Sequence, residues 1–164
     1  MRSILIVYHS DTGGTSQMVD AAARGATAAE PAVEVCVRHA DRAGAEDLLR
    51  ADGYLFATPE NLAAISGVVK RFFDRTYYAV LDRLVGRPYA TMVCAGSDGH
   101  NAARQIERIA TGWRLKAIAD PLIVCTHAQT PEQILRAKTI DEPDRERCGE
   151  LGATLAGGIA LGIF

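Results

Sequence analysis

The sequence lacks a strong excess of charge of either sign and any long apolar run. Its 164 residues carry a formal net charge of −2. With no basic surplus to attract it, nucleic acid is not a predicted partner. No stretch approaches the roughly 20 apolar residues of a membrane span, so no membrane partner is expected. Only Met1 and Arg2 precede the apolar run that ends at Tyr8, which is too short for a signal peptide and predicts a cytoplasmic location.

Paired cysteines and metal-ligand spacings are also missing. None of the cysteines is in a C-x-x-C pair, and most interrupt apolar runs, so we expect free, buried thiols rather than disulfides or zinc ligands. The histidines show no H-x3-H spacing, and no metal site is predicted. The cysteines concerned are Cys36, Cys94, Cys125 and Cys148.

What the chain does have is a regular alternation of short apolar runs and longer amphipathic ones. Alternating strands and helices predict a parallel sheet with helices on both faces, here as a single domain over residues 1–164. Strands are expected at 3–8, 33–38, 53–58, 88–96 and 116–125, and helices at 15–29, 66–84, 100–113, 130–138 and about 142–160.

Two of the expected strands carry signals of a sheet edge. The strand at 33–38 alternates valines with Glu34 and Arg38, as a strand with one wet face does. The strand at 116–125 contains Pro121, which removes a ladder donor. A three-layer α-β-α sandwich with a doubly wound, five-stranded parallel sheet of order 2-1-3-4-5 places these two strands at its edges. Ligands of such sheets bind beyond the carboxyl ends of the strands.

The loop after the first strand, HSDTGGTS at 9–16, offers hydroxyls and glycines but no lysine. Glycines allow backbone amides to converge on an anion, and a helix N-terminus adds a partial positive charge. Neither GxxxxGK[ST] nor GxGxxG is present. A phosphate monoester such as that of FMN, held by neutral donors, is the predicted ligand, and a plain helix cap is the alternative.

Two further loops are expected at the same edge of the sheet. TPENLAAIS (58–66) follows the third strand, and AGSDGHNA (95–102) follows the fourth. Together with the first loop they could hold a phosphate and flank a flat ring.

Three motifs, YHSDTGGTSQM, ATPENLAAISGVVKRFFDRTYY and AGSDGHNA, occur in this order at characteristic separations. With them the chain resembles the flavodoxin-like flavoproteins, and in particular the short flavodoxins and the NAD(P)H-dependent FMN reductase-like proteins. The resemblance implies the flavodoxin-like fold and an FMN site. It implies that the FMN phosphate is held by Ser10, Thr12, Gly13, Gly14, Thr15 and the backbone amide of Asp11. It places the flavin ring between the segments Thr58–Asn61 and Ala95–Gly99. In these segments Pro59, Glu60 and Asn61 would contact the ring, and Gly96, Ser97 and Gly99 would offer it their backbone amides.

The chain departs from the family's electron shuttles, which tend to be strongly acidic and to sandwich the ring between aromatics. Here the ring loops hold no aromatic residue, and strand five has no long insertion. This favours an NAD(P)H-dependent oxidoreductase in which hydride passes through the flavin N5 and no side chain serves as nucleophile or base. Glu60, Asn61 and His100 are the predicted tuning residues.

Two other functions stay open at this point. One is an electron-transfer module that docks to a redox protein without turnover of its own, and the other is a flavin-free scaffold. A small-molecule acceptor or a redox protein is the expected partner. The apolar end, Leu161 to Phe164, either packs on its own helix layer or meets a second subunit in a homodimer.

Overall fold

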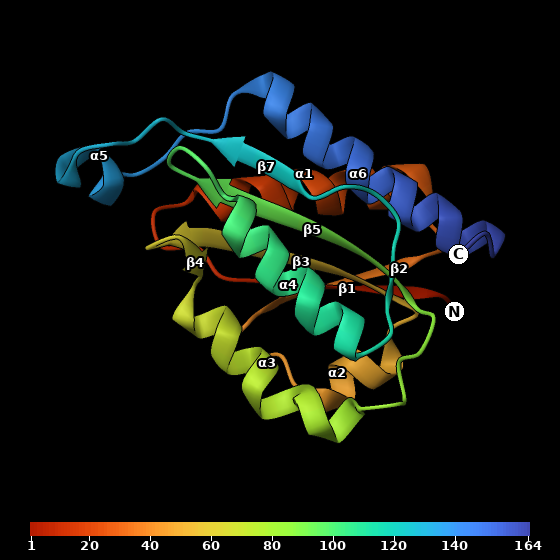
Figure 1. Cartoon of the computed structure of the whole chain (residues 1–164). Helices are drawn as coiled ribbons and strands as arrows, with labels where there is room; N and C mark the ends of the chain where they lie inside the picture. The colour runs from red at the N-terminus through yellow and green to blue at the C-terminus, as the bar shows by residue number, and fades with distance from the viewer.

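A parallel β-sheet with helices on both faces forms the centre of the computed structural model, which describes residues 1–164 (Figure 1). Its strand order is β2-β1-β3-β5-β6, with β7 also paired to β5 and the hairpin strand β4 to β3. This confirms the predicted three-layer, doubly wound architecture. The strands are β1 (Ser3–Tyr8), β2 (Glu34–His39), β3 (Gly53–Asn61), β4 (Ala64–Ile65), β5 (Pro88–Ala95), β6 (Lys116–Ala117) and β7 (Leu122–Cys125).

The predicted fifth strand at 116–125 is not continuous. It forms two short strands, β6 and β7, which pair with opposite ends of β5. Pro121 lies directly before β7, and a proline has no N–H to give to the ladder. The edge position was predicted correctly, but the proline interrupts the strand as well.

Residues 58–66 were predicted to be a loop, and this was wrong. β3 continues through Pro59 to Asn61, turns at Leu62 and Ala63, and returns as β4 in antiparallel pairing. Both turn residues have positive φ, 50° for Leu62 and 64° for Ala63. A two-residue hairpin loop demands this, although Asn-Gly is its usual sequence.

The helices divide between the two faces of the sheet (Figure 1). α1 and α6 cover one face, and α2, α3 and α4 cover the other, while the short α5 lies beyond the sheet edge. None is both long and apolar enough to cross a lipid bilayer. Their bounds are α1 (Gly14–Ala29), α2 (Ala45–Arg50), α3 (Gly67–Val80), α4 (His100–Gly112), α5 (Pro131–Leu135) and α6 (Glu142–Leu161).

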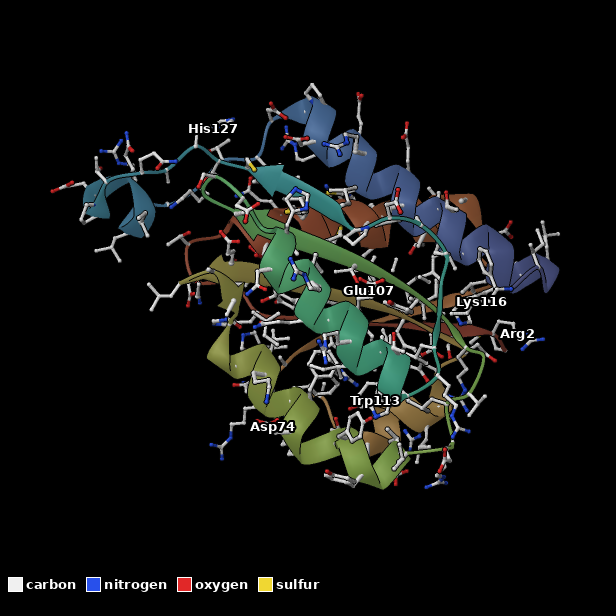
Figure 2. All side chains as sticks on the ribbon, viewed as in Figure 1. Arg2, Asp74, Glu107, Trp113, Lys116 and His127 are labelled. Carbon is white, nitrogen blue, oxygen red and sulfur yellow. The ribbon has the colours of Figure 1, made fainter.

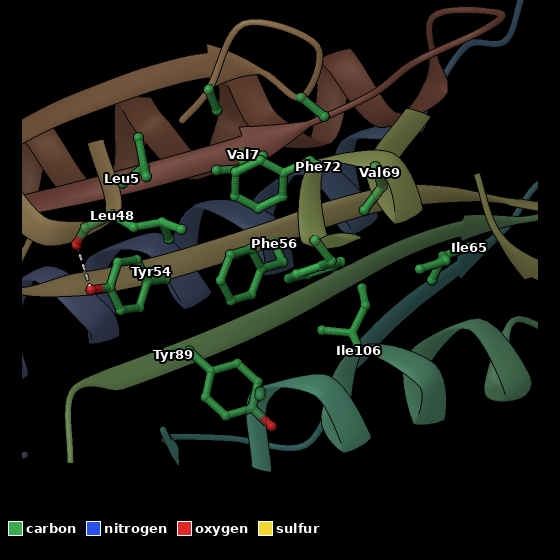
Figure 3. Close-up of a cluster of buried hydrophobic side chains, with 14 of the residues drawn as sticks. Leu5, Val7, Leu48, Tyr54, Phe56, Ile65, Val69, Phe72, Tyr89 and Ile106 are labelled. Carbon is green, nitrogen blue, oxygen red and sulfur yellow. Dashed lines mark hydrogen bonds between the residues drawn. The ribbon is translucent and has the colours of Figure 1, made fainter. Parts of the chain in front are cut away.

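Each face of the sheet carries its own apolar core. On the α3–α4 side, Phe56 of β3 stacks on Tyr54 of the same strand, with 5.8 Å between ring centroids (Figure 3). The Phe56 centroid also lies 5.2 Å from that of Phe73 in α3 and 6.4 Å from that of Trp113. Trp113 is buried, and its Nε1 donates to the Tyr77 carbonyl at 3.1 Å, which satisfies the indole N–H. Alternate residues of β1 face the two cores, so the strand is covered on both sides as expected.

α1 and α6 pack on the other face at unusually close range. A Cβ added at Gly25 would overlap the Gly149 carbonyl, and one at Gly152 would overlap the Ala22 carbonyl. Glycines of both helices, Gly25 in α1 and Gly152 in α6, therefore let the two backbones touch. At the C-terminus, Phe164 packs against this core while Leu161 and Ile163 are exposed, so the predicted homodimer stays a prediction.

Candidate functional site

A cavity of about 760 Å³ opens at the carboxyl end of the sheet. Four segments meet there, namely the β1–α1 loop, the β3–β4 hairpin, the β5–α4 loop and the chain after β7. Its size is typical of a small-molecule or cofactor site. Eleven of the residues predicted for the site line it: Ser10, Asp11, Thr12, Gly14, Thr15, Pro59, Glu60, Asn61, Ala95, Gly96 and Ser97.

The β1–α1 loop is folded around one hydroxyl. Ser10 Oγ accepts from the N–H groups of Gly13 and Ser16, both at 3.2 Å, and Gly13 adopts φ 91° to make the turn into α1. Gly13 thus shapes the loop from outside the cavity. Five backbone N–H groups at residues 10–15 donate to no acceptor in the protein, those of Ser10, Asp11, Thr12, Gly14 and Thr15.

Thr15 adds an unpartnered side-chain donor. The residue is buried, yet its Oγ1 has no hydrogen-bond partner. Leaving a buried hydroxyl unpaired costs about 1–3 kcal/mol. Free amides, this hydroxyl and the positive end of the 16-residue helix α1 together fit the oxygens of a phosphate.

Glycines bring the loops close enough to form the cavity. A Cβ on Gly14 would lie 2.6 Å from Cys94 Sγ, and one on Gly96 would lie 2.8 Å from the Ala128 carbonyl oxygen. The start of α1 therefore rests directly on β5, and the β5–α4 loop rests on the chain after β7.

Glu60 fixes the hairpin to the β5–α4 loop. Its Oε2 accepts from the Gly99 N–H at 2.6 Å, and Gly99 holds φ 85° at the start of α4. The Gly99 amide was predicted to face the flavin ring, but it is already used here. Thr58 also has a bracing role, since its buried Oγ1 donates to the Pro59 carbonyl and accepts from Ser66 N–H.

A chain of side chains links the hairpin to the phosphate loop and to α3. Asn61 Nδ2 donates to Asp11 Oδ2 at 3.1 Å, and the other Asp11 oxygen lies 3.2 Å from His9 Nε2. His9 Nδ1 lies 2.9 Å from Ser66 Oγ, which also accepts from Val69 N–H as the cap of α3. The Ser66 proton therefore points to Nδ1, and His9 carries its own proton on Nε2, facing Asp11.

This arrangement makes stability depend on His9 at mildly acid pH. Burial lowers the pKa of His9 below its usual 6.5. The positive charge of a protonated His39 lowers this pKa further, whereas the negative charges of Asp11 and Asp41 raise it by less than burial lowers it. The unfolded chain then takes up the proton first, so stability present above pH 6.5 is lost as the pH falls toward the folded pKa. His9→Gln is expected to flatten the fall in unfolding free energy between pH 7 and 5, measured by urea titration. An identical fall in both proteins would contradict this role.

His100 does not reach the cavity. Its side chain is 78% exposed, and its Nε2 lies 4.0 Å from Asp98. His100, which was predicted to tune the flavin together with Glu60 and Asn61, is therefore not among the residues that line the cavity.

Two of the four thiols, those of Cys94 and Cys148, are buried and protonated and are therefore poor nucleophiles. Cys94 forms part of the cavity floor, and burial raises its pKa to about 11. Burial raises the pKa of Cys148 to about 12. Both stay protonated at neutral pH, which confirms the prediction of buried free thiols for these two, whereas Cys36 and Cys125 are half-buried.

Lys138 is the site residue that the sequence did not reveal. Its Nζ lies 3.4 Å from Thr12 Oγ1, although 126 positions separate the two residues. The phosphate loop has no lysine of its own, and nothing near Lys138 in the sequence marks it as a partner of that loop. Only the path of the chain after β7 brings them together.

The lining of the cavity includes exposed apolar side chains and no aromatic one. Leu62 at the hairpin turn and Leu135 at the end of α5 are exposed and line the cavity, and Ile134 stands next to the latter. The expected absence of aromatic ring contacts holds for every lining residue.

The comparison with known families decides the class of the protein. Residues 17–129, more than half of the chain, match the model of the NADPH-dependent FMN reductase family. The chain belongs to this family. The prediction of a flavodoxin-like flavoprotein with FMN as cofactor is thereby confirmed. The matched range begins after the β1–α1 loop, so it does not include residues 10–16, and their contact with a phosphate stays a prediction.

Individual relatives carry two kinds of name. A flavodoxin of Aquifex aeolicus (strain VF5) is 38% identical over 97 residues, which are 59% of this chain and 50% of the relative. An NAD(P)H dehydrogenase (quinone) of Acidithiobacillus ferrooxidans is 32% identical over 95 residues, 46% of this chain and 48% of the relative. The chain thus spans about half the length of the curated relatives that it matches.

Solved structures confirm the flavodoxin-like fold. A flavodoxin from the domain Archaea superposes with a TM-score of 0.74 at 16% identity, covering 96% of this chain and 99% of that one. A Streptococcus pneumoniae TIGR4 flavodoxin gives 0.76 at 20% identity with the same coverage.

Proposed function

We propose that this FMN-binding protein is an NAD(P)H-dependent oxidoreductase that passes electrons to a small acceptor such as a quinone. The observation that carries the proposal is the wide cavity whose lining holds exposed apolar side chains and no aromatic one. Such a lining leaves space beside the ring for a nicotinamide or a quinone. Bound FMN supplies the redox chemistry, and the overall balance is NAD(P)H, a proton and a quinone giving NAD(P)⁺ and the hydroquinone.

The protein's own part is to bind and orient. The free N–H groups and the Thr15 hydroxyl would hold the phosphate, and the hairpin and the β5–α4 loop would form the walls of the ring site. Glu60 keeps these walls at a fixed separation through Gly99, and Asn61 keeps the hairpin on Asp11. Glu60 and Asn61 also stay our proposed tuning residues, because both line the cavity.

A flavodoxin-type module is the second candidate. The identity to the Aquifex flavodoxin supports it, and the exposed Leu62 and Leu135 would then lie on the surface that meets a redox protein. A cytoplasmic location and a single domain complete the proposal, in line with the sequence predictions.

Purified protein separates these functions. We expect flavin absorbance bands and steady oxidation of NADH or NADPH when a soluble quinone is added. Flavin bands without NAD(P)H oxidation would favour the flavodoxin-type module. Protein that stays colourless after incubation with excess FMN would reject both.

A further inference from the structure

The segment between β7 and α6 makes an excursion beyond the sheet. It leaves the end of β7 near His127, carries α5, and returns over the phosphate loop before α6 begins (Figures 1 and 2). Lys138 is half-buried, whereas its neighbours Ala137 and Thr139 are exposed.

The backbone at Lys138 is fastened to the phosphate loop from two sides. Its N–H donates to the Thr12 carbonyl at 2.8 Å. Gln17 of α1 donates to the Lys138 carbonyl at 2.7 Å and accepts from Ile140 N–H at 3.0 Å. The same Gln17 amide donates to the Gly13 carbonyl at 2.9 Å, so one side chain couples the loop to the returning segment.

The Lys138 ammonium has no acidic partner. Its Nζ donates to the carbonyls of Ile134 at 2.8 Å and Arg136 at 2.6 Å and to Thr12 Oγ1 at 3.4 Å, and no salt bridge includes it. A partly buried cation held only by neutral oxygens favours an anion beside it. The Lys138 side chain lines the same cavity as the unpartnered Thr15 hydroxyl and the free loop amides.

We infer that Lys138 is a phosphate-binding residue, the cation that the β1–α1 loop itself lacks. It makes the site selective for a phosphorylated flavin over riboflavin. The inference rests on the proposed function, since it takes FMN as the ligand of this cavity. It replaces the purely neutral phosphate site expected from the sequence.

Lys138→Met tests this, because it keeps the apolar stem and the backbone contacts and removes the ammonium group together with its hydrogen bonds to Ile134, Arg136 and Thr12. Titration of apoprotein, followed by flavin fluorescence, should show FMN affinity reduced at least tenfold and riboflavin affinity unchanged. Lys138→Arg should restore FMN affinity to within about threefold. Lys116→Met, on the exposed strand β6 at the far end of the sheet, is the matched control and should change neither affinity (Figure 2).

The effect should also follow the charge of the phosphate. A phosphate monoester loses its second negative charge below about pH 6. The gap in FMN affinity between wild type and Lys138→Met should therefore narrow from pH 7.5 to pH 5.

Three outcomes would overturn the inference. The first is an unchanged FMN affinity in Lys138→Met, and the second is an equal loss of affinity for FMN and for riboflavin. The third is a raised KM for NADPH but not for NADH while FMN still binds, which would assign Lys138 to the phosphate of NADPH. Wild-type protein that binds riboflavin and FMN with equal affinity would likewise show that the Lys138 charge does not contribute to flavin binding. Failure of the wild type to bind any flavin would instead reject the proposed function, and this inference with it.

Discussion

Thr15→Val is expected to weaken FMN binding by about 10- to 150-fold without lowering the stability of the apoprotein. Valine has nearly the shape of threonine, so the packing of this buried residue is kept and only the hydroxyl is lost. A hydrogen bond to a charged group contributes about 1.5–3 kcal/mol, which gives this range of affinity. Flavin fluorescence titration of the apoprotein measures it.

The stability of the apoprotein tests the Thr15→Val variant independently of FMN binding. Thr15 Oγ1 has no partner within the protein, so removing it removes an unpaired polar atom from the interior. The free energy of unfolding without flavin should stay the same or rise. Thr111→Val, on the exposed side of α4, removes a hydroxyl that donates to the Glu107 carbonyl, and should leave FMN affinity alone. Thr15→Val with wild-type FMN affinity would place the phosphate elsewhere.

Gly152→Ala is expected to lower the stability of the protein strongly, although it adds a single methyl group to the helix layer. The added Cβ would overlap the carbonyl of Ala22 in α1, and a backbone group cannot turn aside as a side chain can. Overpacking costs about 1–3 kcal/mol in most cores, and a backbone clash lies at the upper end. For a domain of this size a loss of about 3 kcal/mol lowers the Tm by about 6–12 °C, which a thermal melt would record.

Gly157→Ala provides the control on the same helix. Nothing lies within 4 Å of its added Cβ, so only the better helix propensity of alanine counts. That difference is about 1 kcal/mol, and the Tm should rise by about 2–4 °C. Equal effects of the two substitutions would show that the contact between α1 and α6 does not limit the packing.

The sequence predicted the architecture because the fold repeats a simple pattern. Runs such as Ser3–Tyr8 are apolar on both faces, which only a covered parallel strand tolerates, and Glu34 and Pro121 marked the two edges. The loops 9–16 and 95–102 then had to meet at one end of the sheet, as they do.

The misses have specific physical causes. The hairpin turn at Leu62 and Ala63 was invisible because neither residue is a normal carrier of positive φ. The use of the Gly99 amide by Glu60 depends on two residues that are 39 positions apart in the sequence. Lys138 depends on the same kind of long-range placement, which no local pattern encodes.

The hydrogen bonds from the β3–β4 hairpin have a consequence for the order of events on binding. Glu60 accepts a hydrogen bond from the β5–α4 loop and Asn61 donates one to the β1–α1 loop, and both bonds join groups of the protein itself. We therefore expect flavin to bind a preformed site in which few side chains have to be ordered. Its association should be a one-step process whose rate rises in proportion to flavin concentration and shows no plateau.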